Sequence, residues 1–138
     1  MPFSCSNEVL VSGGDPADRR RALAMLAAAD WGLEPVAAED AEAVSGLTDR
    51  LRFGSLDAIP EDEIRNIAPQ FPDLDFLLLY LSIDGEFFGF LRIRGTDAVE
   101  ESADFPDGDG PEIERIEEAQ PLGQVRRFYA GNPAILLP

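Results

Sequence analysis

The sequence predicts an α+β fold in which helices pack against an antiparallel sheet. Two apolar runs, residues 74–83 and 86–94, are joined by Asp84-Gly85, a dipeptide typical of a β-hairpin turn. Over residues 47–129 the expected elements follow the order strand, helix, strand, strand, helix, strand. This is the order of the split βαβ arrangement, so we expect a ferredoxin-like core over residues 47–129. An extra strand and helix within residues 1–45 would complete a single α+β domain of 138 residues.

The N-terminal extension is predicted to hold a short strand and a helix. Residues 8–12 are mostly apolar and end at Gly13-Gly14, which indicates a strand followed by a turn. Asp15 suits the N-cap of a helix that has Pro16 at its first position. The glycine pattern matches no phosphate-binding loop, and the acidic residues at the helix start would repel an anion, so no phosphate site is expected.

The middle of the chain is predicted to form a connection, a strand and a helix. Residues 30–45 are rich in Ala, Glu and Asp without clear periodicity, which indicates an irregular connection. Residues 47–53 alternate apolar and polar side chains, as a strand does. A helix is expected to begin at Pro60, with acidic residues at the positive end of its dipole. Its buried stripe would be formed by Ile64, Ile67, Ala68 and Phe71.

The hairpin turn predicts which residues lie opposite one another. A type I′ turn, with positive φ at both Asp84 and Gly85, would pair Tyr80 with Gly89 on the facing strand. The same register pairs Leu81 with Phe88 and Leu79 with Phe90. Successive residues of a strand point to opposite faces. The first face then carries Phe76, Leu78, Tyr80, Leu91 and Ile93, and the second face carries Leu77, Leu79, Leu81, Phe88 and Phe90.

Both faces of the hairpin are apolar, unlike those of a half-solvated antiparallel sheet. We therefore expect both faces to be covered. The second face is covered either by another part of this chain, for which the N-terminal strand and helix are the first candidate, or by a partner, including a second copy of the chain.

The segment 97–118 holds ten carboxylates and only one cation, Arg115. Residues 106–111 are predicted to form a loop, 112–120 a short helix and 124–129 the last strand. One interpretation is a solvated segment. The other is a binding surface for a basic protein, which would imitate the charge of a nucleic-acid backbone. The carboxylates assigned to that surface are Glu100, Glu101, Asp104, Asp107 and Asp109.

Composition excludes several kinds of chemistry. The chain has 27 acidic and 11 basic residues, no His and a net charge of −16, and every basic residue is Arg. Mechanisms that need imidazole, and those that need a lysine amine, are therefore excluded. The charge disfavours direct contact with nucleic acid or an anionic membrane. With no signal peptide, no membrane span and a lone Cys5, the sequence predicts a cytoplasmic protein without disulfides.

No residue pattern indicates a metal or a cofactor, and none is expected. Asp107 and Asp109 resemble the middle of a calcium loop, but the first and twelfth ligand positions of that loop fall on Phe105 and Ile116. Cys5 has no base or cation nearby in the sequence, so we interpret it as an ordinary half-buried residue rather than a nucleophile.

Two stretches resemble a family of uncharacterised ferredoxin-like proteins carried on plasmids, phages and integrative elements. The first is the opening Cys5-Ser6-Asn7-x-x-Leu10-Val11-x-Gly13. The second runs from Leu51-Arg52-Phe53 and Pro60 through Ala68 and Phe71-Pro72-Asp73-Leu74-x-Phe76-x-Leu78-x-Tyr80 to Phe88-Gly89. Two departures are Ser4, where the family usually has Trp before the Cys, and the absence of a Trp-rich middle, since Trp31 is the only tryptophan. The resemblance implies a ferredoxin-like fold and a mobile-element context, and no assigned activity.

These observations predict a non-enzymatic, highly acidic module that binds a basic protein, as an accessory or inhibitor protein of a mobile element would. The predicted contact residues are the second hairpin face and the five carboxylates named above. Homodimerisation through that face is an alternative, and so are a metal-dependent hydrolase that uses Asp and Glu clusters and a structural homo-oligomer subunit.

Overall fold

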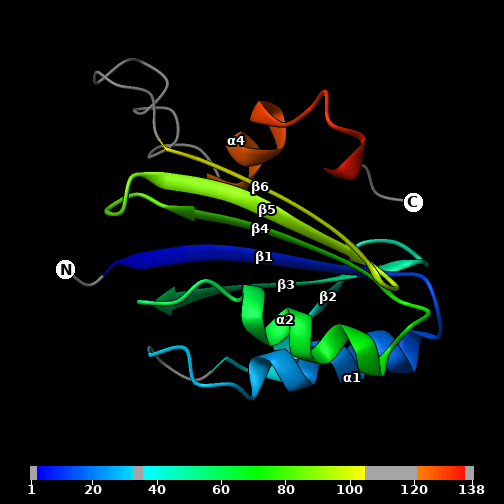
Figure 1. Ribbon diagram of the computed structural model, residues 1–138. Coiled ribbons are helices and arrows are strands. Elements are labelled where there is room, and N and C mark those ends of the chain that lie inside the picture. The colour runs from blue at the N-terminus through cyan, green and yellow to red at the C-terminus, as the bar shows by residue number, and fades with distance from the viewer. Residues whose placement is uncertain (1–2, 33–35, 105–120, 136–138) are drawn as a thin grey trace.

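The computed structural model describes residues 3–32, 36–104 and 121–135, which form a six-stranded antiparallel sheet with helices on both faces (Figure 1). The strands are β1 (Ser4–Ser12), β2 (Glu42–Ala43), β3 (Thr48–Leu56), β4 (Asp75–Ser82), β5 (Phe87–Arg94) and β6 (Asp97–Asp104). The α-helices are α1 (Pro16–Ala27), α2 (Glu61–Ile67) and α4 (Pro121–Phe128). Short 3₁₀ turns are η1 (Ala38–Asp40), η2 (Ala68–Gln70) and η3 (Pro133–Ile135). The α+β class is confirmed.

The strand order, β2-β3-β1-β4-β5-β6, differs from the one expected for a core over residues 47–129. β1 lies between β3 and β4 at the centre of the sheet, so the N-terminal strand is not an addition to a separate core. The last predicted strand, 124–129, is also wrong, because α4 occupies this segment. The predicted loop and helix over 106–120 lie outside the described residues.

The hairpin of β4 and β5 has the predicted register and a different turn. Tyr80 pairs with Gly89, and a methyl group at Gly89 would overlap the Tyr80 hydroxyl and the carbonyl oxygen of Glu101. The type I′ turn is wrong, because neither Asp84 nor Gly85 has positive φ; Glu86 does, at 57°. The connection is a four-residue loop, 83–86, closed by a hydrogen bond from the Glu86 amide to the Ile83 carbonyl.

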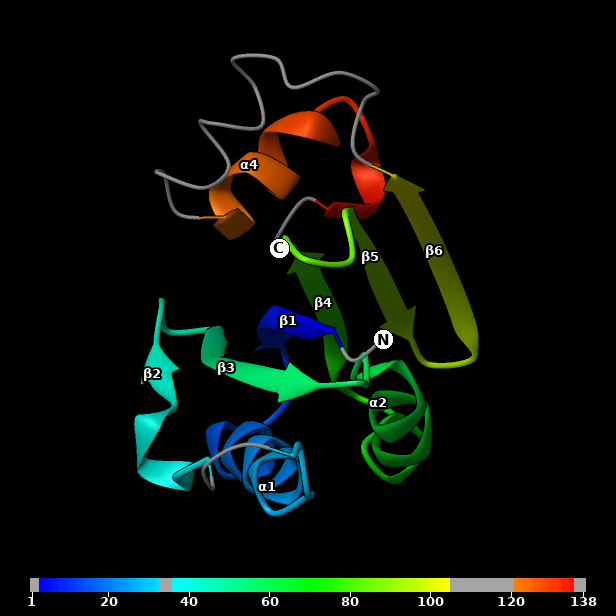
Figure 2. The same cartoon turned by 90° about the vertical axis from the view of Figure 1, so that its left-hand side faces the viewer.

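The two faces of the sheet are covered by different helices, as Figure 2 shows. α1 and α2 lie on the face that carries Phe76, Leu78 and Tyr80. α4 packs Leu122 and Val125 onto the other face. The expectation that both faces are covered is confirmed. The expectation that the N-terminal strand and helix cover the second face is wrong, because β1 belongs to the sheet and α1 covers the first face.

α1 is held to the sheet by a buried arginine. Asp15 caps the helix, and its Oδ1 accepts from the Ala17 amide at 2.9 Å. One turn later Arg19, only 3% exposed, donates from Nε to Asp49 on β3 at 3.0 Å. Its Nη1 donates to the Gly13 carbonyl at 2.7 Å. The guanidinium of Arg19 therefore occupies the turn after β1, where the sequence predicts no phosphate site.

α4 is held to the opposite face by a buried glutamate. Glu8 on β1 is 1% exposed and accepts from Arg52 Nε at 2.8 Å and from Arg126 of α4. The segment after α4 is also bound to the sheet, because Nη1 of Arg92 on β5 donates to the carbonyl of Ala134 in η3 at 2.8 Å. Arg92 and Arg94 also form ion pairs with Asp75 across the sheet.

Candidate functional site: the acidic edge at strand β6

β6 forms one edge of the sheet and carries the described part of the acidic segment. Its residues 97–104 pair with β5 in antiparallel register, from Arg94 opposite Asp97 to Phe87 opposite Asp104. Every side chain of the strand is exposed except Ala103, which is partly buried. The strand holds four carboxylates and no cation (Asp97, Glu100, Glu101 and Asp104). Charged side chains on an edge strand oppose pairing with a second copy of the same edge.

The structure separates the two groups of residues that the sequence assigned to partner binding. Glu100, Glu101 and Asp104 are exposed on β6, whereas Asp107 and Asp109 lie outside the described residues. The five residues of the second hairpin face are buried under α4 of the same chain, each at most 4% exposed: Leu77, Leu79, Leu81, Phe88 and Phe90. With α4 in place, the hairpin face offers no surface to a partner.

The two faces of β6 have different neighbours. On the α4 face, Glu101 accepts a hydrogen bond from Asn132, and its charge adds to burial in raising the pKa of Tyr129. On the α2 face, Glu100 forms an ion pair with Arg65 at 2.8 Å and lies beside Glu61, the first residue of α2. Two carboxyl groups therefore share one arginine on the α2 side.

A hollow of about 350 Å³ opens on the α2 side of β6. Its walls come from α2 and its leading loop, β4, β5 and the end of β6, and the lining residues are Ile59, Glu61, Tyr80, Phe87, Ser102, Ala103 and Asp104. The rings of Tyr80 and Phe87 meet edge to face with centroids 6.3 Å apart. The rings of Phe3 and Phe87 also meet edge to face, with centroids 5.3 Å apart. These contacts fix an aromatic wall beside two carboxyl groups, those of Glu61 and Asp104.

The surroundings of this hollow shift the pKa values of Glu61 and Tyr80. Partial burial raises the pKa of Glu61, and a hydrogen bond to Glu100 and the charge of Glu100 raise it further. Arg65 and a hydrogen bond from Tyr80 oppose the rise without cancelling it. The pKa of Tyr80 is itself raised, first by burial and then by the charge of Glu61. These surroundings therefore favour the protonated form of Glu61 more than water does.

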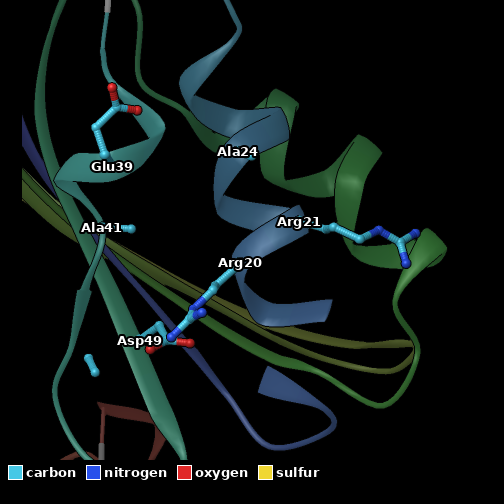
Figure 3. A pocket seen from close by; sticks show the side chains of 7 residues that line it. Arg20, Arg21, Ala24, Glu39, Ala41 and Asp49 are labelled. Carbon is cyan, nitrogen blue, oxygen red and sulfur yellow. The ribbon is translucent and has the colours of Figure 1, made fainter. Parts of the chain in front are cut away.

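A second hollow, of about 480 Å³, lies between α1 and the β2–β3 edge (Figure 3). In this view Arg20 reaches toward Asp49, while Arg21 points away from the hollow. Arg21 pairs with Asp18 at 3.1 Å and lies over the ring of Phe71, as expected for a helix-surface arginine. Asp49 already forms an ion pair with Arg19, and the remaining lining is mostly alanine. This hollow therefore offers few polar groups that could bind a ligand.

The lone cysteine is not a reactive centre. Cys5 is 3% exposed, more buried than expected, and burial followed by the charge of Asp84 raises the pKa of its thiol to about 12. At neutral pH it is therefore a thiol and not a thiolate. Within residues 3–32, 36–104 and 121–135, no three acidic or cysteine side chains are grouped so as to hold a metal ion. No helix in this part of the chain is long and apolar enough to cross a membrane.

Sequence reasoning found the carboxylates of β6 and missed the groups that surround them. Glu61 was interpreted only as a helix-start residue, and Tyr80 and Phe87 only as hairpin residues. Nothing in the local sequence brings the start of α2 next to β6, because their contact depends on the strand order. The pairing of Tyr80 with Gly89 was the available signal, since it places the Tyr80 hydroxyl against the backbone of β6.

Comparison with protein-family models, with curated proteins and with solved structures finds no match to this chain.

Proposed function

We propose that this chain is a non-enzymatic module that binds a basic partner protein through the acidic edge at β6. The observation that carries the proposal is an eight-residue edge strand with four exposed carboxylates and no cation. The opposite edge, β2, has only two residues and offers no comparable surface. Charge complementarity of this kind mainly raises the association rate and selects among partners.

The architecture around the edge supports a rigid binding surface. β6 is hydrogen-bonded to β5 along its whole length, and Glu100 and Glu101 are oriented by Arg65 and Asn132 on opposite faces. A preorganised surface loses less conformational entropy on binding than a mobile acidic tail does. We also propose that the edge mimics a nucleic-acid backbone. A basic host protein would then bind the carboxylates of β6 where it otherwise binds phosphates.

We further propose that β1 to β4, with α1 and α2, form a ferredoxin-like unit, and that β5, β6 and α4 are additions to it. The strand order β2-β3-β1-β4, and the position of both helices on one face, support this assignment. It would place the unit in the N-terminal part of the chain instead of residues 47–129. It also fits the resemblance to mobile-element proteins, which suggests a context of disarming a host protein.

The binding proposal is tested with a charge-neutral edge. The variant D97N/E100Q/E101Q/D104N removes the four carboxylates of β6 and keeps the side-chain sizes. Proteins captured from a lysate of the source organism are identified, and the binding of each purified candidate to the wild-type chain is measured at low and high salt. We expect the partner to be basic, to dissociate at high salt, and to bind the variant at least about tenfold more weakly.

A matched control removes the same charge elsewhere. The variant D30N/E39Q/D40N/D73N neutralises four exposed carboxylates that lie outside both β6 and α2. It should retain the wild-type affinity to within about twofold if the β6 edge is the contact surface. Equal losses in both variants would mean that net charge alone attracts the partner, and the proposed surface would be abandoned.

A further inference from the structure

The hollow beside β6 combines the two features that hold an arginine side chain, an aromatic wall and carboxylates. Tyr80 and Phe87 supply the wall, and Glu61 and Asp104 supply the carboxyl groups. A guanidinium group is planar, stacks on aromatic rings and donates hydrogen bonds in a fork that matches a carboxylate. The volume, about 350 Å³, is at the small end of the range of ligand pockets, roughly 300–1,000 Å³.

The same chain shows this combination at another place. On α1, the guanidinium of Arg21 lies 5.4 Å from the ring centroid of Phe71 and donates to Asp18 at 3.1 Å. At that place an arginine of the same chain binds both the ring and the carboxylate. Beside the β6 hollow, Arg65 forms its ion pair with Glu100 and acts on Glu61 only through its charge.

The shape of the hollow depends on Gly89. Across the sheet, Tyr80, Gly89 and Ser102 lie in one row of paired residues. Because Gly89 has no side chain, the Tyr80 hydroxyl lies against the backbone of β5 and β6, and a methyl group there would displace it. The sequence therefore keeps the aromatic wall close to the carboxylates of β6.

We propose that this hollow receives one arginine side chain of the partner, which stacks on the partly buried ring of Phe87, held in place by the buried Tyr80, and donates to Glu61 and Asp104. This inference rests on the proposed function, because it assigns an anchor to the same edge. A metal ion fits less well, since no three acidic side chains converge among the residues that the structure describes. Binding of the guanidinium favours the ionised form of Glu61, so affinity should rise with pH as Glu61 loses its proton. The groups that face Glu61 are Glu100 and Asp104 on β6, Arg65 on α2 and Tyr80 on β4.

The test uses a defined probe and amide-resolved NMR. N-acetyl-arginine methylamide is titrated into the isotope-labelled chain, with the uncharged N-acetyl-citrulline methylamide as its near-isosteric comparison. We expect saturable shifts at Tyr80, Phe87, Ser102 and Asp104 with a millimolar dissociation constant, and no saturable shifts with citrulline. Glu61→Gln and Asp104→Asn should each weaken arginine binding at least about fivefold, and each spectrum away from the hollow shows whether the variant is folded.

The control variant is Glu63→Gln, which removes an exposed charge from the same helix outside the hollow. It should bind the probe like the wild type. Equal shifts with citrulline, shifts spread over all acidic residues, or unchanged binding in Glu61→Gln and Asp104→Asn would each overturn the arginine site. If the partner binds Glu61→Gln with wild-type affinity but binds the four-carboxylate variant more weakly, the β6 surface is supported and the arginine anchor in the hollow is overturned. If arginine binds saturably in the hollow but the four-carboxylate variant binds the partner as the wild type does, the hollow is an arginine site, and both the β6 surface and the assignment of that arginine to the partner are overturned.

Discussion

The two faces of the sheet differ in how they are closed. One face lies under α1 and α2, which occur between strands in the sequence and so are joined to the sheet at both ends. The other face lies under α4, which follows β6 in the sequence, and among the described residues its apolar cluster is smaller. Each face also contains two charged residues with almost no exposure, Arg19 and Asp49 on the first and Glu8 and Arg92 on the second. The comparison suggests that the first face determines the stability of the fold, whereas the second is closed by an element that can be removed at lower cost.

The largest expected difference lies between the two arginines that hold the helices. Arg19→Met leaves Asp49 buried without its cation and removes donors from the carbonyls of Gly13 and Gly46. Loss of one partner of a buried pair costs about 3–5 kcal/mol. Arg126→Met leaves Glu8 still paired with the half-exposed Arg52, and we expect about 1.5–3 kcal/mol, the range for a hydrogen bond to a charged group.

Urea unfolding of both variants measures this difference, and hydrogen exchange shows where it arises. In Arg126→Met the amides of α4 should lose more protection than those of α1, because the broken contact lies on the α4 face. Equal loss of stability in the two variants, with equal loss of protection in both helices, would contradict the comparison between the faces.

A second comparison uses neighbouring leucines of β4 that point to opposite faces. Leu78 and Leu79 are both fully buried, the first in the α1–α2 cluster and the second in the α4 cluster. Leu-to-Ala changes in cores cost about 2–5 kcal/mol, and the cost is lower where the surroundings can collapse into the cavity. We expect Leu78→Ala near the upper end and Leu79→Ala near the lower end, because α4 can move toward the sheet more easily than helices joined at both ends.

Equilibrium unfolding in urea gives the loss of unfolding free energy for each variant. The m-values are compared to confirm two-state behaviour. The two variants differ by one position in the same strand, so each is the control of the other for strand propensity. If Leu79→Ala loses more unfolding free energy than Leu78→Ala, α4 is the more rigid cover, and the second face contributes more to stability than the first.

The parts of the fold that follow from local sequence were predicted well. The Asp15-Pro16 cap and the apolar stripe of α2 need only neighbouring residues, and both are present. The hairpin register was also predicted correctly, although its turn was not. A four-residue loop with Glu86 at positive φ pairs the same residues as a two-residue turn would, because both are centred on Asp84-Gly85.

The errors arose where long-range packing overrides local preference. Residues 124–129 contain Val, Phe and Tyr, which favour strands, yet Leu122, Val125 and Tyr129 are spaced for one face of a helix and bury that face. β6 has a composition of Asp, Glu, Ala and Ser that disfavours strands, and it forms one because β5 offers an unpaired edge. The candidate hollow depends on both long-range facts, so only its carboxylates on β6 could be predicted.

The smallest predicted effect concerns Glu61, whose surroundings contrast with those of Glu8. Glu8 lies between two arginines, whereas Glu61 lies beside Glu100, and partial burial together with that neighbour raises its pKa. A carboxyl with a raised folded-state pKa contributes stability that is complete below its unfolded-state pKa and is lost as pH rises through the folded-state value. The wild type should therefore lose stability, relative to Glu61→Gln, as pH rises from below the ordinary value of 4.5 through the raised pKa. Because Glu61 is partly exposed, solvent screening limits the difference to about 0.5 kcal/mol. Urea midpoints at pH 4 and pH 8, with Glu63→Gln as the control, measure it. If the difference in stability between the wild type and Glu61→Gln is the same at both pH values, the charge of Glu61 is already compensated by its neighbours in the folded chain. No unpaired carboxylate would then remain for an arginine to bind.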